Sequence, residues 1–251
     1  MTAIAHVALT VRDLPGMARF YETALGLEPM GGDGEQRDLG ARGRVLIRLL
    51  GDAAAAPRDP RDAGLFHTAF LLPDRADLGR WLHHAADTGV RLTGASDHGV
   101  SEALYLDDPE GNGIEVYRDR PASDWIRDGD RVEMFTARLD LNDLADAANG
   151  PWQGAPAGTT IGHVHLQAGA MDAAHDFLHG TLGLTRTYDA QGGGWYGWDG
   201  YHHHLAANTW NSRGAGLRPD GAAGLHHVAL TGQAGASAPL TDPFGNRFRF
   251  V

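Results

Sequence analysis

The sequence predicts an α+β protein built from four tandem βαβββ modules, the last of them truncated. Two repeats predict this architecture, one between the halves of the chain and one within each half. In the first repeat, Ile4 to Leu9 (IAHVAL) corresponds to Ile161 to Leu166 (IGHVHL). In both copies a phenylalanine stands fourteen positions after the first histidine, and a Gly-Leu pair begins six positions later. A pattern that recurs at constant spacing indicates a repeated structural unit.

The second repeat divides each half into two cycles. New cycles open at Gly64 to His67 (GLFH) and Gly224 to His227 (GLHH), and close at Asp108 to Asn112 (DPEGN) and Asp242 to Asn246 (DPFGN). The closing segments are predicted turns, because proline presets one turn residue while glycine and asparagine tolerate positive φ. Each turn should therefore precede the last strand of its module.

Each module opens with a short strand of β-branched and apolar residues and, where complete, continues with an amphipathic helix. Such helices are predicted over Leu14 to Leu25 and Arg75 to Thr88. From His67 to Glu115 there are 48 positions, but from His227 to Arg249 only 22. The fourth module should therefore lack its helix and one strand, and Gly232 to Ala238 is interpreted as a loop of small residues.

These repeats predict two domains of two modules each. The N-terminal domain spans 1–120, a connecting segment spans 121–157, and the C-terminal domain spans 158–251. The boundary is placed near residue 155, because Asn149 to Gly158 has the Gly- and Pro-rich composition of a linker.

Composition narrows the functional classes. The absence of cysteine excludes disulfides and thiolate metal sites, so histidine and carboxylate are the strong ligands that remain. A formal net charge of −11 argues against a nucleic-acid partner. The chain has neither a long apolar run nor a signal-peptide pattern, so we expect no membrane partner and a cytoplasmic location. A homo-oligomer is compatible with the sequence.

Three motifs carry a family resemblance: the His-Val-Ala-Leu opening, Phe-Tyr ahead of Leu-Gly-Leu, and Asp-Pro-Glu-Gly-Asn-Gly-Ile-Glu at 108–115. With the repeats, they resemble the vicinal oxygen chelate superfamily of glyoxalases, bleomycin-resistance proteins and extradiol dioxygenases. The block Gly200 to His204, followed by Asn-Thr-Trp, is similar to two-domain bacterial catechol 2,3-dioxygenase-like proteins. The resemblance covers nearly the whole chain. It implies that paired modules curl into open, cup-like sheets, with metal ligands on their first and last strands.

One stretch also matches the spacing of the extradiol dioxygenase signature. The fit departs from it only near its start, where Ser96 replaces the usual small residues. The matching residues are His98, Leu104, Tyr105, Asp108, Pro109, Gly111 and Glu115.

The resemblance implies a single metal site in the N-terminal half, formed by His6, His67 and Glu115. Two imidazoles and a carboxylate on one face of iron(II) leave positions open for other ligands, as in non-haem iron oxygenases. Manganese(II) is the alternative metal, since both ions accept nitrogen and oxygen ligands.

The implied function is extradiol ring cleavage of a catechol-type aromatic, with both atoms of O2 inserted. The metal would orient the small aromatic substrate and O2 together. His98 would then donate or accept protons, and Tyr105 would hydrogen-bond the substrate oxygens.

Two other classes stay open. A glyoxalase-type lyase or isomerase would need a fourth protein ligand on the segment Arg44 to Leu50, which offers Arg48 instead. A small-molecule-binding resistance protein would need no metal.

The C-terminal half also leaves a question open. It keeps His163 and His227, but Arg249 stands at the glutamate position and cannot ligate a metal. Whether these histidines form a second site together with His202, His203 and His204 is not decided by the sequence.

Overall fold

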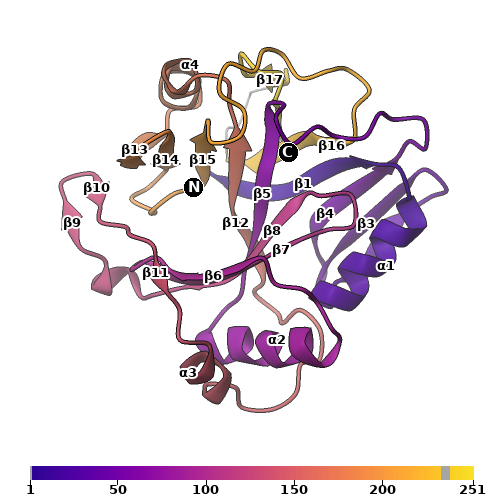
Figure 1. Ribbon diagram of the computed structural model, residues 1–251, viewed down its shortest axis with the longest axis vertical. Coiled ribbons are helices and arrows are strands. Elements are labelled where there is room, and N and C mark those ends of the chain that lie inside the picture. The colour runs from indigo at the N-terminus through magenta and orange to yellow at the C-terminus, as the bar shows by residue number, and fades with distance from the viewer. Residues whose placement is uncertain (1, 233–237) are drawn as a thin grey trace.

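Two curled, open β-sheets with helices on their outer faces form the fold, as the computed structural model of the chain shows (Figure 1). The structure describes residues 2–232 and 238–251. Strands predominate and the sheets have the cup shape that the sequence predicted, so the predicted fold class is confirmed.

The first sheet has seven strands in the order β17-β18-β16-β1-β4-β3-β2. It combines the first and the last module of the chain. Its strands are β1 (Ala3–Val11), β2 (Glu28–Gly32), β3 (Gln36–Ala41), β4 (Arg44–Gly51), β16 (Gly224–Thr231), β17 (Leu240–Thr241) and β18 (Arg247–Phe250).

The second sheet has nine strands in the order β11-β6-β7-β8-β5-β12-β15-β14-β13. It combines the two middle modules. Its strands are β5 (Gly64–Leu71), β6 (Gly94–Asp97), β7 (Ser101–Asp107), β8 (Gly113–Asp119), β11 (Ala137–Arg138), β12 (Thr160–Gln167), β13 (Thr185–Ala190), β14 (Gly193–Gly197) and β15 (Leu205–Asn208).

The two long helices begin at aspartate caps. Helix α1 (Leu14–Leu25) follows Asp13, whose carboxylate accepts a hydrogen bond from the backbone N–H of Gly16, and it ends at Gly26 in the left-handed conformation. Helix α2 (Arg75–Asp87) is capped in the same way by Asp74. The prediction for α1 is met in full, and α2 ends one residue earlier than predicted.

The remaining elements are short. They are the single turns η1 (Ala122–Asp124) and η2 (Asp176–Thr181), the helices α3 (Leu141–Asp146) and α4 (Met171–His175), and a separate hairpin of β9 (Arg127–Asp128) and β10 (Arg131–Val132).

The sheets do not follow the halves of the sequence. Strand β1 pairs antiparallel with β16, and β5 pairs antiparallel with β12, so each sheet contains one module from each half. Within each sheet, the first strands of the two modules pair with each other, and this pairing crosses the predicted domain boundary. Each of the predicted segments 1–120 and 158–251 contributes strands to both sheets, so neither contains a complete sheet.

The fourth module is short, as expected. Between β16 and the β17–β18 hairpin, the described residues contain no helix. Residues 233–237 of the predicted loop lie outside the described part of the chain. Among the described helices, none is long and apolar enough to cross a membrane.

Candidate metal centre

Strand register gathers three potential metal ligands on one face of the nine-stranded sheet. Ala69 of β5 lies opposite Glu115 of β8 on one side and opposite His163 of β12 on the other. His67 stands two residues before Ala69, so its side chain emerges on the same face. The small side chain of Ala69 leaves room for the three longer ones to converge above it.

The donor atoms of the three residues are almost equidistant. The Oε2 atom of Glu115 lies 3.0 Å from Nε2 of His67 and 3.1 Å from Nε2 of His163, and the two nitrogens are 3.2 Å apart. Three adjacent ligands of an octahedral ion with bonds of ~2.1 Å are separated by about 3 Å. The triangle therefore has the size of one octahedral face, and no other such His, Asp and Glu group occurs among the described residues.

The protonation states also suit a cation. Burial alone would raise the pKa of Glu115, but the charges and hydrogen bonds of His163 and His67 outweigh it and hold the pKa well below its usual range. Burial lowers the pKa of His163, and the neighbouring Glu115 charge opposes this shift. All three side chains are buried, so an anionic carboxylate here needs a positive partner. The residues present fit a divalent metal with nitrogen and oxygen ligands.

His6, predicted as the third ligand, is absent from this cluster. It lies on β1 in the other sheet, where its ring is 5.6 Å from the ring of His227. The prediction assumed that the first two modules share a cup, whereas β5 has its two edges taken by β8 and β12. His163 therefore takes the place that the sequence analysis gave to His6, and the cluster spans both halves of the chain.

The seven-stranded sheet repeats the same arrangement with one change. Ala229 of β16 lies opposite His6 on one side and Arg249 of β18 on the other, and His227 stands two residues before it. Arg249 thus occupies the position that Glu115 has in the first cluster. His163 and His227 lie in different sheets, so the C-terminal histidines do not form a site of their own.

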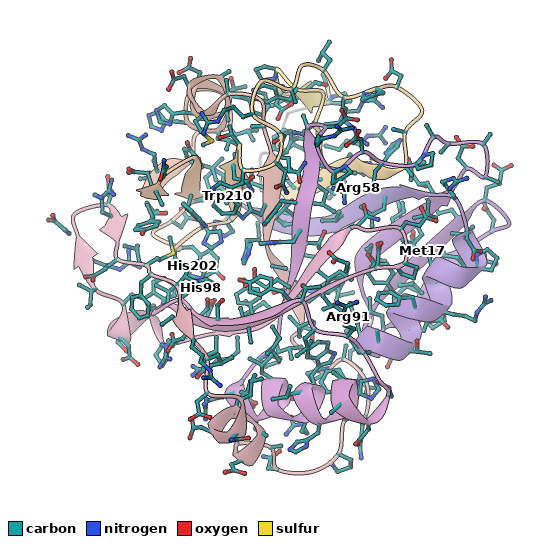
Figure 2. The ribbon with its side chains drawn as sticks, in the orientation of Figure 1. Met17, Arg58, Arg91, His98, His202 and Trp210 are labelled. Atoms are coloured by element: carbon teal, nitrogen blue, oxygen red, sulfur yellow. The ribbon has the colours of Figure 1, made fainter. Side chains whose placement is uncertain are left out.

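A cavity of about 510 Å³ opens over the cluster. Among the described residues that line it, none is Lys or Arg, and its two carboxylates belong to Asp107 and Glu115. Aromatic side chains cover much of its wall. They are Phe66, Tyr105, Phe135, Tyr188, Trp195 and Trp210, and Figure 2 labels Trp210 and His98 of this lining.

The two predicted catalytic residues, His98 and Tyr105, both belong to this lining and are hydrogen-bonded to each other. The Nε2 atom of His98 is 2.8 Å from the hydroxyl of Tyr105, and its Nδ1 is 2.8 Å from the carbonyl oxygen of Phe135. A carbonyl only accepts, so Nδ1–H donates to it, and Nε2 accepts a hydrogen bond from the hydroxyl of Tyr105. Burial, and then the nearby Glu115 charge, raises the pKa of Tyr105 well above its usual range. Tyr105 therefore stays protonated.

Sequence reasoning did not assign a role to His203, which lines the cavity and whose ring centroid is 4.1 Å from that of His163. Burial lowers its pKa well below the usual range. The signal was present in the sequence, because the histidine block at 202–204 directly precedes β15, the strand paired with β12. The pairing of β12 with β5, which brings this histidine block next to His67 and Glu115, was not evident from the sequence.

Comparison with known proteins shows the family of the chain. The model of the Glyoxalase/Bleomycin resistance protein/Dioxygenase superfamily matches residues 3–116. The chain is 36% identical to the catechol-2,3-dioxygenase of Bacillus subtilis (strain 168) over 91% of its own length and 82% of that protein. The chain belongs to this superfamily.

Two further comparisons agree. The chain is 30% identical to biphenyl-2,3-diol 1,2-dioxygenase 3 of Rhodococcus globerulus, over 48% of this chain and 65% of that protein. Among solved structures, glyoxalase I from Zea mays superposes with a TM-score of 0.59 at 14% identity, covering 100% of this chain and 92% of that chain. The last comparison concerns the fold alone.

Proposed function

We propose that the protein is an extradiol ring-cleaving dioxygenase that acts on a catechol-type aromatic and O2. The observation that carries the proposal is the triangle of His67, Glu115 and His163 beneath an aromatic-walled cavity. Two neutral imidazoles and one carboxylate on a single face are the ligands of non-haem iron(II) oxygenases. The dioxygenases named above support the same activity.

The three ligands would hold iron(II), with manganese(II) as the alternative. When bound, the ion would supply open positions at which the two hydroxyl groups of the substrate and O2 are brought together. As metal ligands, His67 and His163 would bind through an imidazole lone pair, and Glu115 would supply one negative charge that offsets part of the charge of the ion.

The surrounding side chains bind the ring and move protons. The aromatic wall of Phe66, Trp195 and Trp210 packs against a flat substrate and excludes water. His203, next to His163, is the side chain placed to accept a proton from a substrate hydroxyl. The hydroxyl of Tyr105 donates to Nε2 of His98, which holds it in place, and its oxygen can accept a hydrogen bond from a substrate hydroxyl.

A glyoxalase-type lyase is the second candidate within the same superfamily. That reaction would call for a fourth protein ligand, and among the described residues the group contains three. A small-molecule-binding resistance protein would not need the buried Glu115 with its two histidine partners.

Metal analysis and oxygen uptake on one sample test the proposal. Protein loaded with iron(II) under anaerobic conditions should retain one ion per chain and consume O2 when catechol is added. The ring-opened product absorbs visible light, which gives a second readout. Protein that binds one ion but takes up no oxygen with any catechol would overturn the dioxygenase assignment and favour the lyase.

A further inference from the structure

We propose that Asp119 and His202 are positioning residues that fix His203 in the tautomer whose Nδ1 carries the proton. Nε2 is then left as an unprotonated nitrogen for a ligand in the cavity. The role of His203 as a proton acceptor rests on the proposed function, whereas the tautomer is argued from the hydrogen bonds that join Asp119, a neutral His202 and His203.

The chain of contacts begins at a carboxylate. Asp119, the last residue of β8, has Oδ1 2.8 Å from Nε2 of His202 and Oδ2 2.7 Å from the hydroxyl of Tyr201. An ionised carboxylate accepts hydrogen bonds and donates none. Both neighbours must therefore donate, and Tyr117, whose hydroxyl is 2.9 Å from that of Tyr201, donates in turn to Tyr201.

The carboxylate decides the tautomer of each histidine after it. Neutral His202 that donates from Nε2 has a lone pair on Nδ1. This Nδ1 is 2.7 Å from Nδ1 of His203, so His203 must donate from its own Nδ1. Among the described residues, Nε2 of His203 has no hydrogen-bond partner, and His203 lines the cavity.

His202, the middle residue of this hydrogen-bonded series, is held in place by its surroundings. His202 is fully buried, its backbone carbonyl accepts a hydrogen bond from Thr187, and the ring of Trp125 lies edge-on at 5.0 Å. Figure 2 labels His202 in this position. A buried imidazole without room to rotate cannot exchange its two nitrogens, so its orientation is set by these contacts.

The other sheet contains a natural contrast. His226 and His227 are also adjacent, with Nδ1 atoms 2.7 Å apart. Among the described residues no carboxylate contacts the far nitrogen of His226. A carboxylate in the position of Asp119 is therefore a specific feature of the sheet that carries the cavity.

Nitrogen NMR of histidine tests the tautomer directly. The protein is labelled with ¹⁵N-histidine and loaded with zinc(II), which is diamagnetic, and the His203 signals are assigned from a His203→Gln sample. In the unchanged protein, Nε2 of His203 should show the shift of an unprotonated nitrogen. A protonated Nε2 would overturn the proposal, since it would mean that His202 donates from Nδ1.

The variant Asp119→Asn supplies the decisive comparison. Its amide can donate to Nε2 of His202, which reverses each donor along the chain and places the proton of His203 on Nε2. With iron(II), we expect kcat for catechol to fall by about 100-fold, while KM and metal content change less than about twofold. Unchanged NMR shifts of His203 in this variant would overturn the proposal.

A matched control removes a different carboxylate of the same sheet. Asp189 is half-exposed on β13 and pairs with Arg131, and Asp189→Asn should change neither the tautomer nor kcat. If the unchanged protein shows the expected tautomer and Asp119→Asn reverses it, but the unchanged protein takes up no oxygen, the positioning role stands and the dioxygenase function is overturned. If the unchanged protein takes up oxygen but Asp119→Asn leaves the tautomer of His203 unchanged, the dioxygenase function stands and the positioning role is overturned.

Discussion

Glu115 and Arg249 occupy the same position in two sheets of the same construction. Each lies on the last strand of its module, opposite an alanine that also faces a histidine, with a second histidine two residues before that alanine. The carboxylate suits one cluster to a divalent metal, whereas the guanidinium makes the other cluster unsuitable because it is a permanent cation.

Exchanging this residue should create a second metal site. The rings of His6 and His227 are 5.6 Å apart, close to the 5.3 Å between His67 and His163, and Nε2 of His6 is buried without a partner among the described residues. The variant Arg249→Glu should therefore raise the iron(II) content from one to two ions per chain. In Arg249→Leu, which only removes the charge, the content should stay at one. A single ion in both variants would contradict the prediction.

The identity of the third ligand can be tested with two histidine variants. His163→Ala should lose most of its bound metal, more than the ~10- to 100-fold weakening that follows the loss of a hydrogen-bond partner outside the ligand set. His6→Ala, which removes a histidine at the corresponding position of the other sheet, should keep one ion per chain. Metal analysis after dialysis distinguishes them, and the reverse result would restore His6 as the ligand.

A second pair of variants should distinguish a metal ligand, Glu115, from a catalytic residue, His98. Glu115→Gln should lose the metal and all activity because it removes the negative charge that faces the ion. His98→Asn should keep the metal and lose turnover by ~100- to 10,000-fold, the range typical of a proton-transfer residue. Metal content and oxygen uptake are measured on the same samples. Full turnover in the His98 variant would mean that Tyr105 needs no partner.

The charge of the cavity predicts substrate preference. Because the described lining has two carboxylates and no Lys or Arg, catechol should be cleaved with a higher kcat/KM than 3,4-dihydroxybenzoate, whose carboxylate would be repelled. Asp107 is exposed at this lining, so Asp107→Asn should narrow the difference by roughly two- to fivefold, as expected for one solvent-screened charge. Asp59→Asn, which changes a partly exposed carboxylate outside the lining, is the control. Equal cleavage of both compounds would contradict the prediction.

The free energy of unfolding should decrease in mildly acidic solution because of His227, which lies beside His6 in the seven-stranded sheet. Burial, and then the neighbouring His226 and Arg249, lowers the pKa of His227 to about 3. Between this value and the ordinary value of about 6.5, the unfolded chain binds a proton that the folded chain does not, so the free energy of unfolding should fall as the pH decreases through this window. Urea titrations of metal-free protein should show a weaker pH dependence in His227→Asn. Parallel curves would contradict the assignment.

Local patterns in the sequence predicted local structure well. The helix at Leu14 to Leu25 was predicted to the residue, since its aspartate cap and terminal glycine are sequence-local signals. His67, Glu115, His98 and Tyr105 were placed in one cavity because their spacing lies within a single module. Which modules associate depends on pairing between strands far apart in the chain, such as β5 with β12, and no local pattern encodes it. His6 was therefore expected where His163 lies, and the network of His203, His202 and Asp119 was missed.

The pairing of β1 with β16 also sets the order in which the protein can be completed during synthesis. The strand that carries His6 leaves the ribosome before the other described strands and can pair with β4 early, but its other neighbour, β16, begins only at Gly224, so the seven-stranded sheet is completed late. The nine-stranded sheet needs only residues up to Asn208 and can close earlier. Contacts between such distant segments fold slowly, because a long loop must close before they form. A nascent chain should therefore assemble the cluster of His67, Glu115 and His163 while its strand β1 still has an unpaired edge.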